Sequence, residues 1–165
     1  MDLLLLILSL VLGFFLLLAL FYRKEISSEI EIEASAERVW QHLTDFESFP
    51  EWNPFIRKAS GEIKVGERIE VFLQLPEGKG MTFRPKLLKV ERNRELRWLG
   101  RLGIPRLFDG EHIFIIEQLG EGRVRFVQRE KFKGFLAPLF LAMIKSSTLL
   151  GFEEMNKVLK ERAEK

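Results

Sequence analysis

The sequence feature that most constrains the fold is a pair of alternating segments, 111–119 and 123–132, joined by a Gly-Glu-Gly loop at 120–122. A short glycine-containing connection between two alternating runs is typical of an antiparallel β-hairpin. The chain therefore contains at least one antiparallel sheet, and this hairpin specifies much of its register.

The three-residue loop fixes which residues of the hairpin lie opposite each other: His112 with Glu130, Phe114 with Gln128, and Ile116 with Phe126. Directly opposed residues share one face of a sheet. The other face is basic, with Arg123, Arg125, Arg129 and Lys131. A slip of one residue would exchange the two faces, so the register is well specified.

The rest of the chain from residue 28 reads as strands and helices in a fixed order. Strands are expected at 28–34, 56–63, 68–75, 81–91 and 96–101, with a turn signal at 76–78 among those that separate them. Helices are expected at 36–44, N-capped by Ser35, in a short segment within 45–54, and at 138–162. Such an order predicts a mostly antiparallel sheet with a long amphipathic helix over one face.

The strand at 81–91 carries a predicted irregularity. The turn at 92–94 pairs Val90 with Leu96 and Leu88 with Trp98, whereas the doubled Leu87 and Leu88 beside a proline indicate a β-bulge.

The first 22 residues differ from the rest, because residues 3–22 carry no charge. Twenty helical residues span roughly 30 Å, the thickness of a bilayer core. A cleaved signal peptide would have a basic start and a small-residue cleavage site, and neither is present. Residues 1–25 are therefore expected to form a single-pass membrane anchor and juxtamembrane segment. Every Lys and Arg follows the span and only Asp2 precedes it, which predicts an outside N-terminus and a cytoplasmic domain.

Composition excludes several classes of chemistry. The chain has no cysteine, so disulfides, thiolate metal sites and cysteine nucleophiles are ruled out. His42 and His112 lack metal-ligand spacing, and no glycine loop has the context of a phosphate cradle, so no metal or cofactor is expected. A net charge of +2 does not indicate nucleic acid. The basic run at 84–106 is interpreted as a solvated sheet face or a patch attracted to anionic lipid.

The order of elements and five short stretches resemble the START-like, Bet v 1-type superfamily, in particular its polyketide cyclase/dehydrase-like (SRPBCC) branch. The stretches are ASAERVW at 34–40, FPEWNPF at 49–55, FDGEHIF at 108–114, FVQREKF at 126–132 and GFEEMN at 151–156. Each is weak alone, but their order and spacing cover nearly all of 28–162. The membrane anchor is not part of the family pattern.

The resemblance implies an α+β helix-grip fold over residues 26–165, in which a curved antiparallel sheet of about seven strands wraps a long C-terminal helix, with two short helices after the first strand. It also implies an internal cavity for a lipid, sterol, polyketide or other apolar molecule. Candidate cavity residues are Trp52, Phe83, Trp98, His112, Phe114, Phe126, Gln128, Glu130, Phe132 and Met143.

Glu130 and His112 are the only pair that resembles acid–base machinery. Three interpretations stay open: a structural hydrogen-bonded clamp, a polar anchor for a ligand, and a catalytic pair.

Two connecting segments, 102–108 and 134–140, are unusually apolar. They either bury each other as a cap or form a membrane-facing portal, with Ile104, Leu107, Phe108, Phe135 and Leu136 as its candidate residues.

The sequence thus favours a membrane-tethered domain that binds, without catalysis, a small hydrophobic or lipid-like ligand; its protein partners cannot be read from the residues. The alternative is a cyclase-, dehydratase- or isomerase-type enzyme that uses Glu130 and His112. A third option is a scaffold with a filled core.

Overall fold

The structure, a computed structural model, describes the backbone of residues 3–75 and 80–165 and the side chains of these residues except 15 and 18–20. Asp2 and the turn predicted at 76–78 lie outside the described residues. The elements are α1 (Leu3–Phe21), β1 (Arg23–Ile32), α2 (Ala36–Thr44), the 3-10 helix η1 (Phe46–Ser48), α3 (Phe49–Trp52), β2 (Ile56–Ser60), β3 (Glu70–Leu73), β4 (Met81–Phe83), β5 (Lys86–Glu91), β6 (Glu95–Arg101), β7 (Asp109–Gly120), β8 (Arg123–Lys133) and α4 (Ala137–Ala163).

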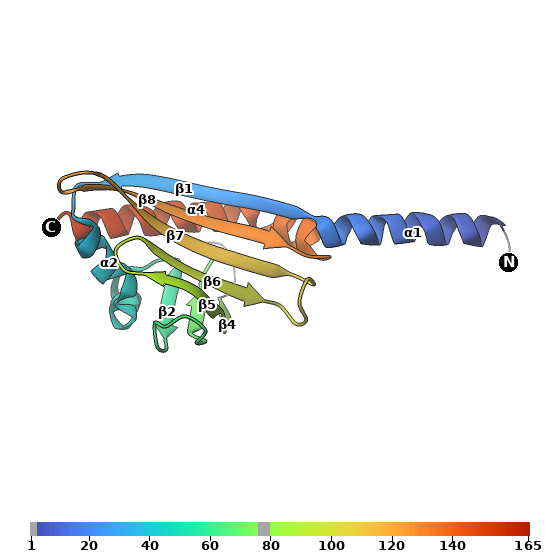
Figure 1. The fold of residues 1–165 in the computed structure, drawn as a ribbon, viewed down its shortest axis with the longest axis horizontal. Helices are drawn as coiled ribbons and strands as arrows, with labels where there is room; N and C mark the ends of the chain where they lie inside the picture. Colours follow the sequence, from blue (N-terminus) through green and yellow to red (C-terminus); the bar gives the residue numbers. More distant parts are fainter. Residues whose placement is uncertain (1–2, 76–79) are drawn as a thin grey trace.

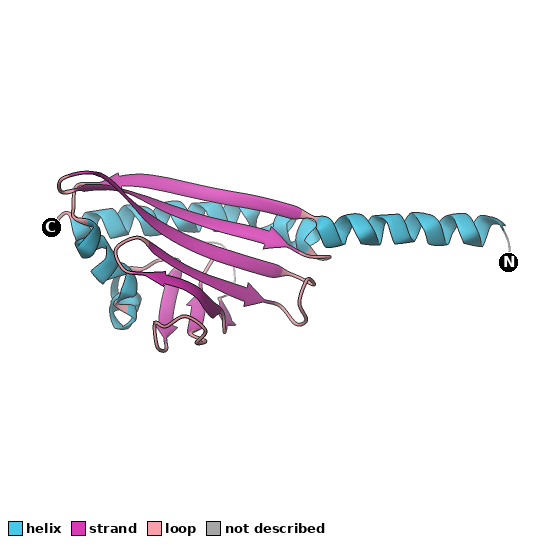
Figure 2. Cartoon of the chain, in the orientation of Figure 1, coloured by secondary structure: helices cyan, strands magenta, loops and turns pink. Residues whose placement is uncertain are grey.

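All strand pairs are antiparallel within the described residues, and they form two sheets, in the orders β1-β8-β7-β6-β5 and β2-β3-β4. A bridge between Arg68 and Lys86 joins the two sheets. Next to it, Ile69 N donates to Pro85 O at 3.1 Å. The two sheets therefore continue into one curved surface that wraps the long helix α4 (Figures 1 and 2). The predicted α+β architecture is confirmed.

The register of the β7–β8 hairpin is the one predicted from its loop. His112 pairs with Glu130, Phe114 with Gln128, and Ile116 with Phe126. Phe114 and Phe126 are completely buried beneath α4, which is the physical reason that a shifted register is disfavoured.

The segment predicted as one strand at 81–91 is divided by Pro85 into β4 and β5. The predicted bulge is present, since the β5–β6 register shifts between Leu87 and Lys89. Val90 pairs with Leu96 as predicted, but the partner of Trp98 is Leu87 and not Leu88. The bulge turns Leu87 fully inward and leaves Leu88 39% exposed. The pairing of Leu88 with Trp98, predicted from the turn at 92–94, was therefore wrong.

β1 begins earlier than predicted. It starts at Arg23, which pairs with Lys133, and the pairing continues to Ile32 opposite Val124. The segment expected to connect an anchor to the domain is thus part of the sheet, and α1 joins the domain through Tyr22 alone.

The FPEWNPF stretch at 49–55 contains the short helix predicted within 45–54 and connects it to β2. Its first four residues form α3, with Pro50 in the first turn. Asn53 then turns the chain into β2, because its Oδ1 accepts hydrogen bonds from Phe55 N (3.1 Å) and Ile56 N (2.8 Å).

α4 runs close to the predicted length, and Pro138 lies in its first turn. Its C-terminal half packs tightly, because Gly151 leaves room for the ring of Phe55, which a Cβ at that position would strike. Asn156 Nδ2 donates to Ser28 Oγ at 3.2 Å, and Lys160 Nζ donates to Glu31 O at 2.8 Å. These bonds tie the helix to β1.

α1 extends away from the domain along its long axis (Figure 1). Among the helices of residues 3–75 and 80–165, none combines the length and apolar character that crossing a membrane requires. The structure therefore does not support the predicted membrane-spanning anchor.

Candidate functional site

A cavity of about 180 Å³ lies between the curved sheet and the N-terminal half of α4. Side chains from β3, β4, β6, β7, β8 and α4 surround it. Most of the wall is apolar, including Val71, Leu73, Phe83, Phe108, Phe132 and Phe140. Dispersion contacts and exclusion of water are therefore what this wall offers a ligand.

Five of the ten candidate cavity residues line this space: Phe83, Trp98, His112, Glu130 and Phe132. They come from four strands, and the β6–β7–β8 register brings three of them together, because Trp98 lies opposite His112 and His112 opposite Glu130. One cross-strand row thus crosses the cavity wall.

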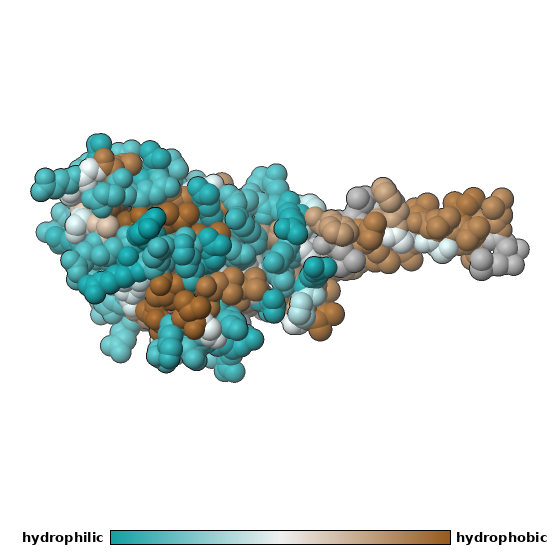
Figure 3. Space-filling view, in the orientation of Figure 1, coloured by the Kyte–Doolittle hydropathy of each residue, from teal (hydrophilic) through white to brown (hydrophobic). Residues whose placement is uncertain are grey.

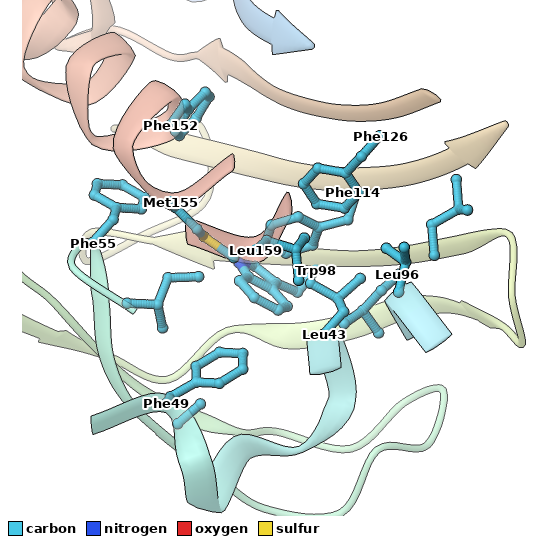
Figure 4. Close-up of a cluster of buried hydrophobic side chains, with 14 of the residues drawn as sticks. Leu43, Phe49, Phe55, Leu96, Trp98, Phe114, Phe126, Phe152, Met155 and Leu159 are labelled. Atoms are coloured by element: carbon cyan, nitrogen blue, oxygen red, sulfur yellow. The ribbon is translucent and has the colours of Figure 1, made fainter. Parts of the chain in front are cut away.

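Three other candidates, Phe114, Phe126 and Gln128, are buried beyond one end of the cavity. The Phe114 ring lies 5.0 Å from the Trp98 ring and 6.0 Å from the Phe126 ring. Figure 4 shows this part of the interior closed by Met155 and Leu159 of α4. These residues face inward as predicted, but they form solid core.

The remaining two candidates, Trp52 and Met143, lie elsewhere. Trp52 is buried against Phe49, with ring centroids 5.3 Å apart, and Arg162 lies over its ring. Met143 is 71% exposed. The helical phase explains this placement, because the residues of α4 that face the cavity are Phe140, Ile144 and Thr148, four apart on one face.

Sequence reasoning missed Phe55, Phe140, Ile144 and Thr148, as well as the contribution of β3. The four-residue spacing on α4 was a readable signal. No comparable signal marked β3, because its position depends on the bridge that joins the two sheets.

The polar part of the wall is a hydrogen-bonded cluster. His112 Nδ1 lies 2.5 Å from Glu130 Oε2, and Gln128 Nε2 lies 3.0 Å from His112 Nε2. With the Gln128 amide nitrogen as donor, the ring accepts at Nε2, so Nδ1–H donates to the carboxylate. The imidazole is 2% exposed and the Glu130 side chain 14% exposed. Glu130 is thus more accessible from the cavity than His112.

Neighbouring rings and a glycine hold this cluster in place. The His112 ring lies 4.4 Å from the Phe114 ring, 5.1 Å from the Phe152 ring and 5.3 Å from the Trp98 ring. A Cβ at Gly110 would collide with Glu130 Oε1. Gly110 therefore makes room for the carboxylate at the cavity wall.

The second histidine lies away from the cavity, at the end of α2. Burial lowers the pKa of His42, and the nearby Arg162 and Arg38 lower it further. In the described part of the chain, no three His, Asp or Glu side chains gather closely enough to hold a metal ion.

The two apolar connections lie side by side at the end of the domain next to α1. Phe135 N donates to Arg106 O and Leu136 N to Leu107 O, both at 2.8 Å. The Phe108 ring packs against the Phe132 and Phe140 rings, at 5.7 and 5.1 Å. The connections therefore cap one end of the cavity.

Part of this cap is nevertheless open to solvent. Leu107, Phe108 and Leu136 are half-buried, whereas Ile104 is 69% exposed and Phe135 is 38% exposed. Figure 3 shows apolar atoms at this end of a largely hydrophilic domain surface, close to the apolar surface of α1.

Comparison with known families shows to which family the chain belongs. The family model described as "Polyketide cyclase / dehydrase and lipid transport" matches residues 23–164. The chain belongs to this family, and the match begins at the first residue of β1. A comparison with curated protein sequences found no significant match.

Solved structures show the same fold at low sequence identity. A START superfamily protein from Mycobacterium smegmatis is 22% identical, with a TM-score of 0.67 over 84% of this chain and 96% of that one. The Zhui aromatase/cyclase from Streptomyces sp. R1128 is 12% identical, with a TM-score of 0.65 over 86% and 96%. A norcoclaurine synthase from Thalictrum is 16% identical, with a TM-score of 0.61 over 85% and 96%.

Proposed function

We propose that the domain binds a small hydrophobic or lipid-like molecule in the cavity under α4. The observation that carries this proposal is the cavity itself, about 180 Å³ with a mostly apolar wall. An apolar protein cavity of ~150 Å³ accommodates benzene, so this space takes an aromatic ring or a short acyl segment. Met81 lies on the cavity wall and is 53% exposed, so a longer ligand is proposed to extend past this side chain.

Glu130 and His112 give the ligand an orientation. A hydroxyl or amide group of the ligand donates to Glu130, whose second oxygen is held by His112. One polar anchor in an apolar pocket is the usual way in which such sites combine affinity with selectivity.

We further propose that the ligand enters through the apolar cap, which acts as a portal facing a membrane. Ile104 and Phe135 are the two exposed residues among the five portal candidates, and they lie at the end of the domain next to α1. Within α1, the exposure of the described leucines ranges from 40% at Leu6 to 75% at Leu4. Exposed apolar area costs roughly 25 cal/mol per Å², so a membrane is the proposed cover for α1, with the domain on the cytoplasmic side. Protease accessibility in intact and permeabilised cells tests that orientation.

Native mass spectrometry of the full chain, purified in a non-ionic detergent, tests ligand binding. Ile144 and Met143 are neighbours on α4, but only Ile144 lines the cavity. We expect a co-purifying apolar molecule with the wild type and with Met143→Trp, and its loss with Ile144→Trp, which fills the space. Repeatedly empty wild-type protein, or equal occupancy in both variants, contradicts the proposal and favours a scaffold role.

The second candidate function is an enzyme of cyclase, dehydratase or isomerase type. The 2.5 Å contact between His112 Nδ1 and Glu130 Oε2 favours it, because a carboxylate held by an imidazole at an apolar wall is suited to proton transfer. The fold is shared with the aromatase/cyclase and the synthase named above.

Isotope exchange separates the two functions. The co-purified molecule is incubated in D₂O with the wild type or with Glu130→Gln. Catalysis of proton transfer predicts deuterium at a carbon position of the molecule, or a new product, with the wild type alone. Binding without catalysis predicts an unchanged molecule in both samples.

A further inference from the structure

A second pocket, of about 160 Å³, lies where α1 joins the domain. The sheet register builds it. Arg23 of β1 pairs with Lys133 of β8, Lys133 with Asp109 of β7, and Asp109 with Arg101 of β6. These four residues form one row across four strands. Because their neighbours Gly110 and Phe132 line the apolar cavity, strand alternation puts Arg23, Asp109 and Lys133 on the opposite face. Arg101, at the end of β6, borders both spaces.

The pocket is strongly basic. Its charged side chains are four cations, Arg23, Arg101, Arg106 and Lys133, and one carboxylate, Asp109. Asp109 is buried, and its Oδ1 lies 3.6 Å from Arg101 Nε. Among the described residues, Arg23, Arg106 and Lys133 have no carboxylate within 4.0 Å. Asp109 is thus paired with Arg101, and the other three cations line the pocket without an ion-pair partner among the described residues.

The end of α1 does not neutralise them. A helix C-terminus carries only about half a negative charge, so about two and a half of the three positive charges remain uncompensated. The pocket therefore attracts an anion, and guanidinium groups bind phosphate oxygens in a bidentate manner.

Arg106 is held at this pocket by a strained backbone. Its φ of 67° lies in the left-handed region, which is uncommon for a residue other than glycine. The strain is maintained because Arg106 O accepts the 2.8 Å bond from Phe135 N, and a Cβ at Gly134 would collide with the same carbonyl. Strained backbone that the surroundings enforce is characteristic of binding sites.

The surroundings indicate which anion fits. The same connection that carries Arg106 exposes Leu102 (41%) and Ile104 (69%), and Phe21 of α1 lines the pocket. A cationic pocket bordered by exposed apolar side chains matches a molecule whose phosphate adjoins acyl chains. A soluble phosphate has no apolar part that could contact these exposed side chains.

We propose that this pocket binds the phosphate of an anionic phospholipid, such as phosphatidylglycerol or phosphatidic acid. Among the described residues, the pocket shares Arg101 alone with the apolar cavity, so we expect its occupancy to be independent of what the cavity binds. Such binding would place the capped end of the domain, with Pro105 and Arg106, at the lipid headgroups.

Native mass spectrometry of the full chain in non-ionic detergent tests the proposal, with dioctanoyl phosphatidylglycerol and dioctanoyl phosphatidylcholine as chain-matched probes. The test variant is Arg106→Asn with Lys133→Gln, since asparagine tolerates a positive φ. The control is Lys58→Gln with Lys86→Gln, which removes the same charge from two exposed lysines outside the pocket. Circular dichroism verifies folding.

We expect phosphatidylglycerol to bind at least tenfold more tightly than phosphatidylcholine. Each basic group near an anionic headgroup contributes about 1 kcal/mol, or about fivefold, so the double variant loses roughly 25-fold for phosphatidylglycerol and little for phosphatidylcholine. The control retains wild-type binding. If the double variant fails to fold, the wild type is measured alone at low salt and in 1 M salt. Screening by 1 M salt is expected to weaken the binding of phosphatidylglycerol and to leave that of phosphatidylcholine unchanged.

Three results overturn the proposal: equal affinity for the two lipids, equal loss in the test and control variants, or displacement of phosphatidylglycerol by inorganic phosphate at the same concentration. The last would mean that the pocket recognises a free anion.

Discussion

The two halves of the space under α4 differ sharply, although the same helix and the same three central strands bound both. Towards the C-terminus of α4, Phe114, Phe126, Phe152 and Leu159 are completely buried and fill the interior. Towards its N-terminus, Phe140 and the neighbouring wall enclose a cavity of about 180 Å³. The fold therefore supplies stability from one half and leaves the other half free for a ligand.

The polar cluster stands at the boundary between the halves. His112 packs on the core ring of Phe114, while its partner Glu130 lines the cavity. A buried imidazole needs its hydrogen-bond partners, so the cluster serves the core and the site together.

The largest expected effect comes from truncating one aromatic in each half. Phe114→Ala removes a fully packed ring and is expected to cost about 3–5 kcal/mol in the free energy of unfolding. Phe140→Ala is expected to cost roughly 1 kcal/mol, because this half-buried ring already borders empty space. Chemical denaturation of the full chain in detergent measures both. Similar losses at the two positions would refute the contrast between the halves.

The next largest effect on the free energy of unfolding is expected at the polar cluster of His112 and Glu130. Glu130→Leu leaves the buried His112 Nδ1–H without an acceptor, which is expected to cost about 1–3 kcal/mol. Glu130→Gln keeps an acceptor oxygen and is expected to cost less than about 1 kcal/mol. Equal costs for the two variants would show that the hydrogen bond contributes no stability.

Gly110→Ala tests how the carboxylate is placed. The new Cβ collides with Glu130 Oε1, so overpacking of about 1–2 kcal/mol is expected, together with weaker retention of the co-purified ligand. Gly120→Ala is the matched control in the same strand, because a Cβ there meets nothing within 4 Å. Stable protein with undiminished ligand after Gly110→Ala would argue against Glu130 as the anchor.

The smallest effect is a pH dependence at the packed end. Hydrogen bonds from Lys160 and from the backbone N–H of Glu33 lower the pKa of Glu164 below its usual 4.5. A lowered folded-state pKa stabilises the fold above pH 4.5, and this contribution disappears as the pH falls through the lowered value.

Glu164→Gln should therefore lower the thermal midpoint slightly at pH 7 and approach the wild type near pH 3. An equal difference between the two proteins at both pH values would contradict this assignment.

Much of the packed half could be predicted from the sequence, since local signals determine it. The Gly-Glu-Gly loop gave the pairing of Phe114 with Gln128, and Ser35 gave the start of α2, where it accepts a hydrogen bond from Arg38 N at 3.2 Å. Alternation and capping act over a few residues and leave a readable pattern.

The hollow half was less predictable, because a cavity is a small difference between two large volumes. The sequence showed that Phe114 and Phe132 face inward, but only the packing against Met155 and the other α4 residues shows which of the two borders empty space. The bulge at Leu87 and the early start of β1 shifted further residues, because distant strands and not local propensity set those positions.

The most direct test of ligand binding in this cavity is a crystal structure of the full chain soaked with iodobenzene, whose iodine gives an anomalous signal. We expect a peak inside the cavity, among Phe83, Phe108 and Phe132, and no peak there in Ile144→Trp. A cavity filled by its own side chains, with iodine only at the surface, would contradict the proposed ligand-binding function.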